Sequence, residues 1–229
     1  MPHVFLQSPW IHPEEPEPLK RIFRTLGRRL EVPAGALLPY ETTEPLVGLL
    51  ESGLGAFSFT DRQGRGHTFA LILPGRVFGD LDVISGRRPN LHGMAIRRST
   101  ILILERSRWQ AALEMSTELM RVHMRQAIIK QECHMEGMIA NYTLDLAERM
   151  KALLRSVIES WYPLRTDGWN PLPIALNVTE ISRIVSANRS SASVILSRWT
   201  DEGLVRRDGR RLILHGSLFE DPEERITPP

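Results

Sequence analysis

Residues 107–161 contain no proline, and Gly137 is the only glycine among them. Leu, Met, Ala, Glu and Arg, which are strong helix formers, dominate this run. A proline-free stretch of this length predicts helices rather than strands. It therefore separates two parts of the chain, which differ in their sequence patterns.

The apolar residues at the start of this run fall in two stripes. The first has heptad-like spacing and consists of Met115, Leu119, Val122, Ile129 and Cys133. The second consists of Met120, Met124, Ala127 and Ile128. Two stripes predict a helix that is packed on two sides. We expect a helix over about residues 107–140 that covers its own domain and pairs with a second subunit, which predicts a homodimer. A helix buried within one subunit is the alternative.

Short apolar runs fill the part of the chain before the helical run, between Glu31 and Glu105. The runs LVGLL, GAFSF, HTFALIL and TILIL are separated by turn signals such as PAG, ESG, PGR and SGRRPN. Short strands at regular spacing with glycine turns are typical of a β-barrel or sandwich. The segment DRQGRG between two of these runs predicts a hairpin turn.

The composition is that of a globular protein, with 42% hydrophobic and 24% charged residues in a chain of 229. No apolar stretch approaches the length of a membrane span, and the first residues lack the pattern of a signal peptide. We therefore expect a cytoplasmic protein without a membrane partner. Cys133 is the only cysteine, which excludes a disulfide within the chain and disfavours an iron–sulfur cluster.

Residues 179–199 fit two helices joined by a tight turn at residues 186–188, after a proline-rich linker or small hairpin at residues 163–173. Asn188 is a good N-cap for a second helix that begins at Arg189. The first helix has an apolar face of Ile181, Ile184 and Val185. The inner face of the second helix consists of Ala192, Ile195, Leu196 and Trp199.

The outer face of this second helix combines small hydroxyls with one long donor, Arg189. A surface that enters the major groove of DNA needs small side chains, and an arginine fork pairs with O6 and N7 of guanine. Serine hydroxyls and helix N-termini suit phosphates. We predict contacts to double-stranded DNA from Thr179, Asn188, Arg189, Ser190, Ser191, Ser193 and Val194. An ordinary helical hairpin with a solvated serine-rich face is the alternative.

Basic side chains follow this helix. The segment GLVRRDGRRLILH predicts a β-hairpin wing around Asp208 and Gly209. Residues 174–216 contain seven Arg and four acidic residues, whereas residues 217–229 contain one Arg and four acidic residues. The weak net charge of +2 thus hides a basic module. Further contacts to DNA are expected from the wing residues Arg206, Arg207, Arg210 and Arg211.

The stretch EISRIVSANRSSASVILSRWTDEGLV resembles, without a gap, the DNA-binding segment of the CRP/FNR family of bacterial transcription regulators. The resemblance extends over nearly the whole chain. It implies an α+β fold, with a β-roll or jelly-roll sensor and its dimerisation helix in residues 1–140 and a winged helix-turn-helix domain in residues 141–229. It also implies a homodimer on a near-palindromic DNA site, with RNA polymerase as a further candidate partner.

The resemblance also assigns roles on the second helix. Arg189 stands where many members of the family have a base-reading arginine. Ser190 replaces a common glutamate, and Val194 replaces a common arginine. The resemblance therefore supports DNA binding, while these two departures predict a half-site that differs from the usual sequence of the family.

The segment LPGRVFGDLDVISGRRPNLHGMAIRRSTILIL resembles the phosphate-binding cassette of the family. Cyclic-nucleotide binders have there a Gly-Glu pair and then an Arg-Ser pair, which hold the ribose and the cyclic phosphate. The departures from this pattern, Asn90 above all, lead us to expect an effector other than cyclic AMP. The resemblance and the neighbouring basic residues assign the effector pocket to Gly79, Asp80, Arg87, Arg88, Asn90, Leu91, His134 and Met135.

Other cofactors and functions have weaker signals. His and Met residues can ligate haem, but nothing in their spacing marks a haem or metal site. Cys133 fits a small core residue better than a redox-sensitive thiol. No P-loop, HExxH, GxSxG or dinucleotide fingerprint is present, so we do not expect an enzyme. Two alternatives stay open: a front domain that senses nothing, with DNA binding independent of any ligand, and a cupin-like metal enzyme.

Overall fold

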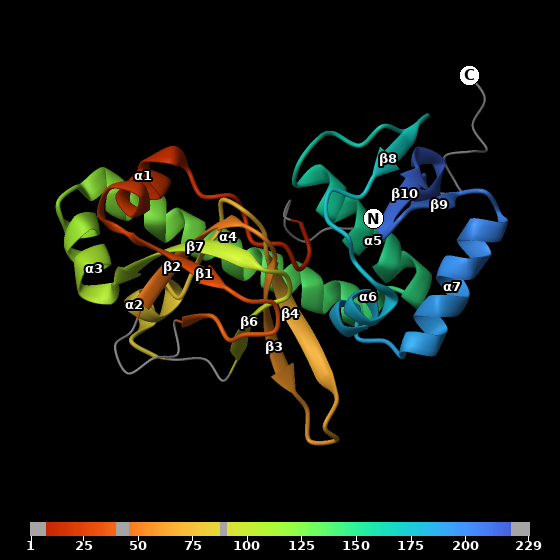
Figure 1. Cartoon of the computed structure of the whole chain (residues 1–229), viewed down its shortest axis with the longest axis horizontal. Helices are drawn as coiled ribbons and strands as arrows, with labels where there is room; N and C mark the ends of the chain where they lie inside the picture. The colour runs from red at the N-terminus through yellow and green to blue at the C-terminus, as the bar shows by residue number, and fades with distance from the viewer. Residues whose placement is uncertain (1–7, 40–45, 88–90, 221–229) are drawn as a thin grey trace. The chain divides into compact units, whose positions relative to one another are not determined.

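The structure is a computed structural model that describes residues 8–39, 46–87 and 91–220. The chain divides into two compact units, Met1–Gly137 and Met138–Pro229 (Figure 1). The division falls inside the long helix α4 (Thr117–Thr143), close to the boundary that the sequence suggests. Each unit contains both helices and strands, so the α+β fold class is confirmed.

The first unit is built around a β-roll. One sheet has the strand order β1-β7-β2-β5, and another has the order β4-β3-β6. All neighbouring strands in these sheets are antiparallel. The strands of the first sheet are β1 (Arg28–Val32), β2 (Leu46–Ser52), β5 (Val77–Phe78) and β7 (Ser99–Glu105). The strands of the second are β3 (Gly55–Thr60), β4 (Gly66–Ile72) and β6 (His92–Ala95).

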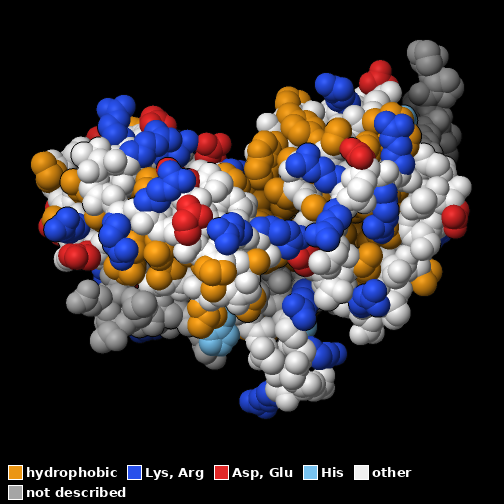
Figure 2. Space-filling model, viewed as in Figure 1, with side chains coloured by type: hydrophobic (Ala, Val, Ile, Leu, Met, Phe, Trp, Pro, Cys, Tyr) orange, Lys and Arg blue, Asp and Glu red, His pale blue; other side chains and the backbone are white. Residues whose placement is uncertain are grey.

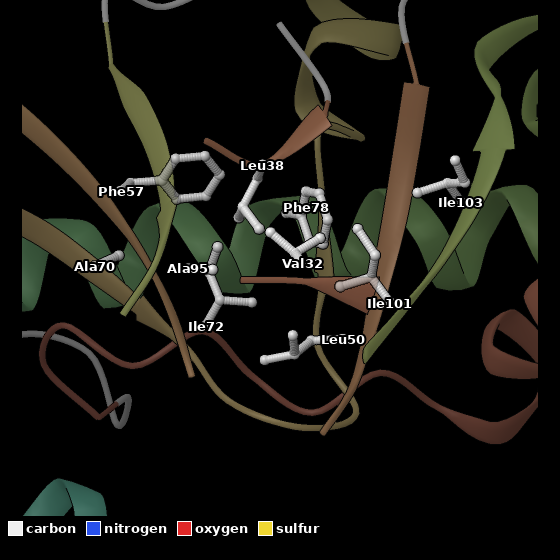
Figure 3. Packing of buried hydrophobic residues seen from close by; sticks show 10 residues of the cluster. All are labelled: Val32, Leu38, Leu50, Phe57, Ala70, Ile72, Phe78, Ala95, Ile101 and Ile103. Atoms are coloured by element: carbon white, nitrogen blue, oxygen red, sulfur yellow. The ribbon is translucent and has the colours of Figure 1, made fainter. Parts of the chain in front are cut away.

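Alternation along these strands places apolar side chains inside the roll. Figure 3 shows such side chains from both sheets pointing toward one another. Burial of each large side chain of this kind contributes about 1.5–3 kcal/mol. The cluster consists of Val32, Leu38, Leu50, Phe57, Ala70, Ile72, Phe78, Ala95, Ile101 and Ile103.

The predicted hairpin turn between residues 60 and 66 is confirmed. The Asp61 carboxylate accepts the backbone N–H groups of Gln63 and Arg65, each at 2.9 Å. Gly64 has a φ of +77°, a conformation that glycine adopts without strain. The turn joins β3 to β4, which pair from Thr60 opposite Gly66 to Gly55 opposite Ile72, with a shift of register between Ser58 and Phe57.

Helices cover the outer face of the larger sheet. The helix α1 (Glu17–Leu26) buries Leu19 and Phe23, and α3 (Arg106–Glu114) buries Trp109 and Leu113. The rings of Phe23 and Trp109 lie 4.9 Å apart. These residues form a second apolar cluster with strand residues such as Val47. A short helix, α2 (Leu81–Ser85), follows β5.

The single helix expected over residues 107–140 is wrong in its start. The chain forms α3, a break at Met115 and Ser116, and then α4. The Ser116 hydroxyl accepts the backbone N–H of Leu119 at 3.3 Å, which is the geometry of an N-cap. Met115 therefore lies outside the long helix, with 87% of its surface exposed.

The first apolar stripe does not form the free face of α4. Leu119 and Val122 pack against the second apolar cluster of their own unit, and Cys133 is buried. At 100° per residue, the exposed apolar residues lie on the opposite side of the helix. They are Met124, Ile128, Met135, Met138 and Tyr142. The predicted stripe of Met115, Leu119, Val122, Ile129 and Cys133 is therefore not a free face of α4, because four of its members are covered by their own unit and Met115 lies before the helix.

The second unit contains helices and a small sheet. The helix α5 (Leu146–Glu159) begins after Asp145, whose side chain accepts the Glu148 N–H at 2.9 Å. The sheet has the strand order β8-β10-β9 and is followed by the short helix η2 (Gly216–Phe219). Its strands are β8 (Trp169–Pro171), β9 (Val205–Asp208) and β10 (Arg211–His215). Part of the expected linker, residues 169–171, is thus an edge strand.

Candidate functional site: a helix-turn-helix with a wing

The two helices predicted in residues 179–199 are present as α6 (Val178–Ile184) and α7 (Arg189–Asp201). The N-terminus of α6 has a capping box, because Asn177 accepts the Glu180 N–H and Glu180 accepts the Asn177 N–H, each at 2.9 Å. Thr179 lies in this first turn and is half-buried. The capping box fixes where α6 begins.

The turn between α6 and α7 depends on one unusual residue. Ser186 has a φ of +50°, in the left-handed region that non-glycine residues seldom adopt. The next residue, Ala187, donates its N–H to the Ser182 carbonyl at 2.8 Å, which closes the turn. Asn188 is the N-cap of α7, as predicted, although its side chain makes no capping hydrogen bond.

The α7 helix buries one face and exposes the other. Ala192, Leu196 and Trp199 are buried against the unit. Arg189 is the first residue of the helix, and its guanidinium makes no hydrogen bond or ion pair with the described residues. Val194 has 68% of its surface exposed. The predicted outer-face residues are all exposed: Arg189, Ser190, Ser191, Ser193 and Val194.

The wing is confirmed as a tight hairpin between β9 and β10. Asp208 pairs with Arg211, and Gly209 has a φ of +54°, so Gly209 and Arg210 form the turn. Figure 2 shows Lys and Arg side chains gathered around this hairpin. Arg206, Arg207, Arg210 and Arg211 are all exposed.

The wing arginines point in different directions. Residues directly opposite one another in a sheet share a face, and Arg207 pairs with the buried Leu212, whereas Arg206 pairs with Ile213. The Arg206 guanidinium stacks on the Trp169 ring at 4.0 Å from its centroid. Arg206 and Arg207 therefore lie on opposite faces of the hairpin.

The expected effector pocket has a different chemistry from the one predicted. Asp80 is buried, and its carboxylate accepts a hydrogen bond from the Lys130 ammonium at 2.7 Å. Lys130 is fully buried and also lies 2.6 Å from a Glu15 carboxylate oxygen. Burial lowers the pKa of Lys130, but the two carboxylates outweigh it and raise the pKa above its ordinary value. Asp80 is therefore already paired with a cation of its own chain.

The two helix residues assigned to the pocket do not face the same way. His134 is buried, and its Nε2 lies 2.9 Å from Nε2 of His12. Burial lowers the pKa of His134 to about 4. Met135 belongs to the exposed stripe of α4, with 40% of its surface exposed. His134 and Met135 therefore lie on different faces of the helix and do not line one pocket within this unit.

The remaining pocket residues are dispersed. Arg87 is exposed, Leu91 packs partly against the core of the roll, and Gly79 has a φ of +76° in the turn after β5. Arg88 and Asn90 lie outside the described residues. The basic cluster predicted around residues 87–92 therefore has no described geometry that would hold an anion.

The groups that a metal or a redox reaction would use are the cysteine thiol and clusters of His, Cys, Asp and Glu side chains. Burial raises the pKa of the Cys133 thiol to about 12, which keeps the thiol protonated and unreactive. Within residues 8–39, 46–87 and 91–220, no group of three or more His, Cys, Asp or Glu side chains is placed to hold a metal ion. The same residues include no helix that is long and apolar enough to cross a membrane.

Solved structures with this arrangement are transcription regulators. FixK2 from Bradyrhizobium japonicum matches with a TM-score of 0.71 and 19% identity, over 82% of this chain and 92% of FixK2. A transcriptional regulator of the CRP/FNR family from Thermus thermophilus matches with a TM-score of 0.63 and 19% identity, over 85% of this chain and 99% of that one. The chain has the CRP/FNR fold.

A third structure with the CRP/FNR fold is CLP from Xanthomonas campestris, described as a c-di-GMP-responsive global regulator. It matches with a TM-score of 0.68 and 14% identity, over 87% of this chain and 99% of CLP. No protein-family model and no curated protein matches the sequence. Sequence identities of 14–19% establish a shared fold. They do not transfer the c-di-GMP response of CLP to this chain.

The buried polar residues of the first unit were not predicted from the sequence. Lys130, Glu15 and His12 form buried polar contacts, but they are far apart in the sequence. The sequence contains one indication that Lys130 is buried. This charged residue is flanked by apolar stripes and so sits at a core position of the helical pattern. The segment before α1 has no pattern, apart from its prolines, that would indicate burial of His12 and Glu15.

Proposed function

We propose that the protein is a sequence-specific transcription regulator that binds double-stranded DNA. The observation that carries this proposal is the exposed N-terminal half of α7, where Arg189 begins a surface of small hydroxyl side chains. A recognition helix of this composition can approach base edges closely. The exposed arginines of the wing supply contacts to phosphates.

The proposed regulator acts as a homodimer through α4. The exposed apolar residues Met124, Ile128, Met135, Met138 and Tyr142 follow a heptad-like spacing along one side of the helix. An apolar stripe of this kind, interrupted by the exposed Gln131, suits a helix that packs against its own copy. Two copies would present two α7 helices to a near-palindromic site, with RNA polymerase as a candidate partner.

Selection of bound duplexes from a random DNA pool tests the proposal. The full chain should enrich one sequence with two related half-sites about 10–10.5 base pairs apart, centre to centre. The selection is run with and without a small-molecule extract of cells, so that a requirement for an effector is visible. Recovery of unrelated sequences in both arms would contradict sequence-specific binding.

A sensor that needs no small molecule is the second candidate. The observation that favours it is the buried contact of Lys130 with Asp80 and Glu15, which supplies from the chain the charges that a ligand would bring. Enrichment of the same DNA site without extract supports this version, and enrichment only with extract supports an effector other than cyclic AMP.

A further inference from the structure

Residues 8–16, which we call the strap, lie along β4 of the roll. Leu71 donates its N–H to the Trp10 carbonyl at 2.7 Å, and His12 donates its N–H to the Leu71 carbonyl at 3.2 Å. Ile11 and Leu71 form a parallel bridge. The Glu15 N–H reaches the Gly75 carbonyl at 2.9 Å. The strap is therefore bound to the roll through its backbone.

The other contacts of the strap are with α4. The Trp10 N–H donates to the Cys133 carbonyl at 3.4 Å, and the Trp10 ring lies so close to Gly137 that a Cβ there would be 2.7 Å from it. His12 meets His134 at 2.9 Å. The strap thus touches the roll and the helix at once.

The ammonium group of Lys130 forms ion pairs with both the strap and the roll. Lys130 of α4 contacts Glu15 of the strap at 2.6 Å and Asp80 of the roll at 2.7 Å. All three side chains are buried. Removal of one partner from a buried ion pair is strongly destabilising, because it leaves a charge without compensation. The Lys130 ammonium therefore couples three separate segments of the first unit.

The strap is bound imperfectly, which makes its release feasible. The Glu15 carboxylate is buried, so its charge depends on the Lys130 ammonium 2.6 Å away for compensation. Nδ1 of His12 is buried without a partner among the described residues. Burial raises the pKa of Glu15 and lowers that of His12. Water would satisfy these groups on opening, which offsets part of the packing that is lost.

We propose that the strap is an internal ligand of the sensor unit, which clamps the roll to α4 through Glu15 and Lys130 and whose release alters DNA binding. Asp80 and His134, two residues predicted to hold an effector, are contacted from within the chain by Lys130 and by His12 of the strap. Release frees the inner face of α4, the helix proposed to form the dimer. The link to DNA rests on the proposed function.

Hydrogen exchange of the full chain, read by mass spectrometry, tests the clamp. Glu15→Gln keeps the shape of the side chain and removes its charge. Exchange in residues 8–16 and in β4 should become at least about tenfold faster than in the wild type. Glu14→Gln is the matched control, because Glu14 is exposed and pairs with Lys20 at the surface. Unchanged exchange of the strap in the Glu15→Gln protein would overturn the proposal.

A second variant keeps the test usable if the Glu15→Gln protein does not fold. Glu15→Asp keeps the charge and withdraws it by one methylene, so a smaller increase in exchange is expected in the same two segments. An increase spread evenly over the whole chain would overturn the local clamp, because it would show a general loss of stability.

Affinity for the selected DNA site tests the regulatory part. Glu15→Gln should change the affinity at least about threefold, and Glu14→Gln should leave it unchanged. Equal affinities of the two variants would overturn the link between strap and DNA. A wild-type chain that prefers no DNA sequence would overturn the proposed function instead, and the exchange experiment would still decide whether the strap is a clamp.

Discussion

At the scale of single residues, the recognition surface depends on Arg189 and on the turn that precedes it. Arg189 is exposed at the start of α7, and its guanidinium makes no hydrogen bond or ion pair with the described residues. Serines beside it are too short to reach far into a groove. Base reading by this helix therefore rests mainly on one guanidinium.

Arg189→Ala should weaken binding to the selected site by about 1–3 kcal/mol and relax the preference at one base pair per half-site. Arg210→Ala is the comparison, because Arg210 lies in the turn of the wing and is expected to contact phosphate. It should weaken specific and scrambled DNA alike and reduce the salt slope by about 0.9. Binding titrations at several salt concentrations measure both effects. If Arg189→Ala weakened binding to the selected site and to scrambled DNA equally, Arg189 would contact phosphate rather than a base.

Ser186 has the left-handed conformation that closes the turn between α6 and α7. Ser186→Val should lower the free energy of unfolding by about 1–2 kcal/mol, because a β-branched side chain is strained at positive φ. Ser186→Gly, which tolerates this conformation, serves as control and should be more stable than the Val variant by urea denaturation. Equal stability of the Val variant and the wild type would argue against strain in this turn.

At the scale of elements, α4 has two faces with different chemistry. Its exposed face is apolar and includes Ile128 and Met135. Its inner face carries buried polar side chains, including Lys130 and His134. The outer face is suited to a second subunit, whereas the inner face depends on contacts within the first unit.

Ile128→Glu combined with Met135→Glu should convert the proposed dimer to a monomer, because two charges cannot be buried in an apolar helix interface without partners. Sedimentation velocity measures the oligomeric state. Arg125→Glu makes the same total change of charge at an exposed position away from the stripe and should remain dimeric. A double variant that still sediments as a dimer would refute this interface.

The inner face predicts a pH dependence of stability. In the unfolded chain, His134 takes up a proton near pH 6.5, whereas in the folded chain its pKa is about 4. The unfolded state binds more protons between these values, so stability falls as the pH drops from about 6.5 to about 4. The charge of Lys130 also lowers the pKa of His134. Burial lowers the pKa of the neighbouring His12 too, so His12 contributes to the pH dependence with the same sign.

Urea denaturation between pH 4 and 7 measures this effect. His134→Gln should reduce the loss of stability over this range by about 2–3 kcal/mol. His92→Gln, at an exposed position, is the control and should retain the dependence of the wild type. The same pH profile in the His134→Gln protein and the wild type would contradict the lowered pKa.

At the scale of the whole molecule, the fold is that of CRP/FNR regulators, and buried polar contacts join distant segments of the first unit. Lys130 forms ion pairs with Asp80 and Glu15, and the His134 ring lies within hydrogen-bond distance of His12. A cyclic nucleotide would have to displace these contacts, and the sequence places Asn90 and Leu91 where an Arg-Ser pair would hold its phosphate.

Calorimetry should therefore detect no tight binding of cyclic AMP to the full chain. Loss of a charge-assisted pair to a buried phosphate costs on the order of 2–5 kcal/mol. The thermal midpoint of unfolding should also stay constant at millimolar cyclic AMP, because a ligand that does not bind cannot stabilise the folded state. Micromolar affinity would refute this expectation.

The sequence by itself determined the features that depend on local pattern. Strand spacing and glycine turns predicted short strands in a barrel or sandwich, and the resemblance to a family narrowed this to a β-roll. The SANR turn between two amphipathic segments predicted α6, α7 and the start at Arg189. The wing around Gly209 followed from its turn chemistry. These features are local, because periodicity and turn residues act within a few positions of the chain.

Only the tertiary structure decided which side of a helix is covered and what meets inside. Heptad spacing alone could not tell the inner stripe with Val122 from the outer stripe with Ile128, since both repeat along α4. The contacts of Lys130 with Glu15 and Asp80 join residues far apart in the sequence. Such pairs arise from the packing of distant segments, and the low polarity of the interior then fixes their partners, because a buried charge must be compensated.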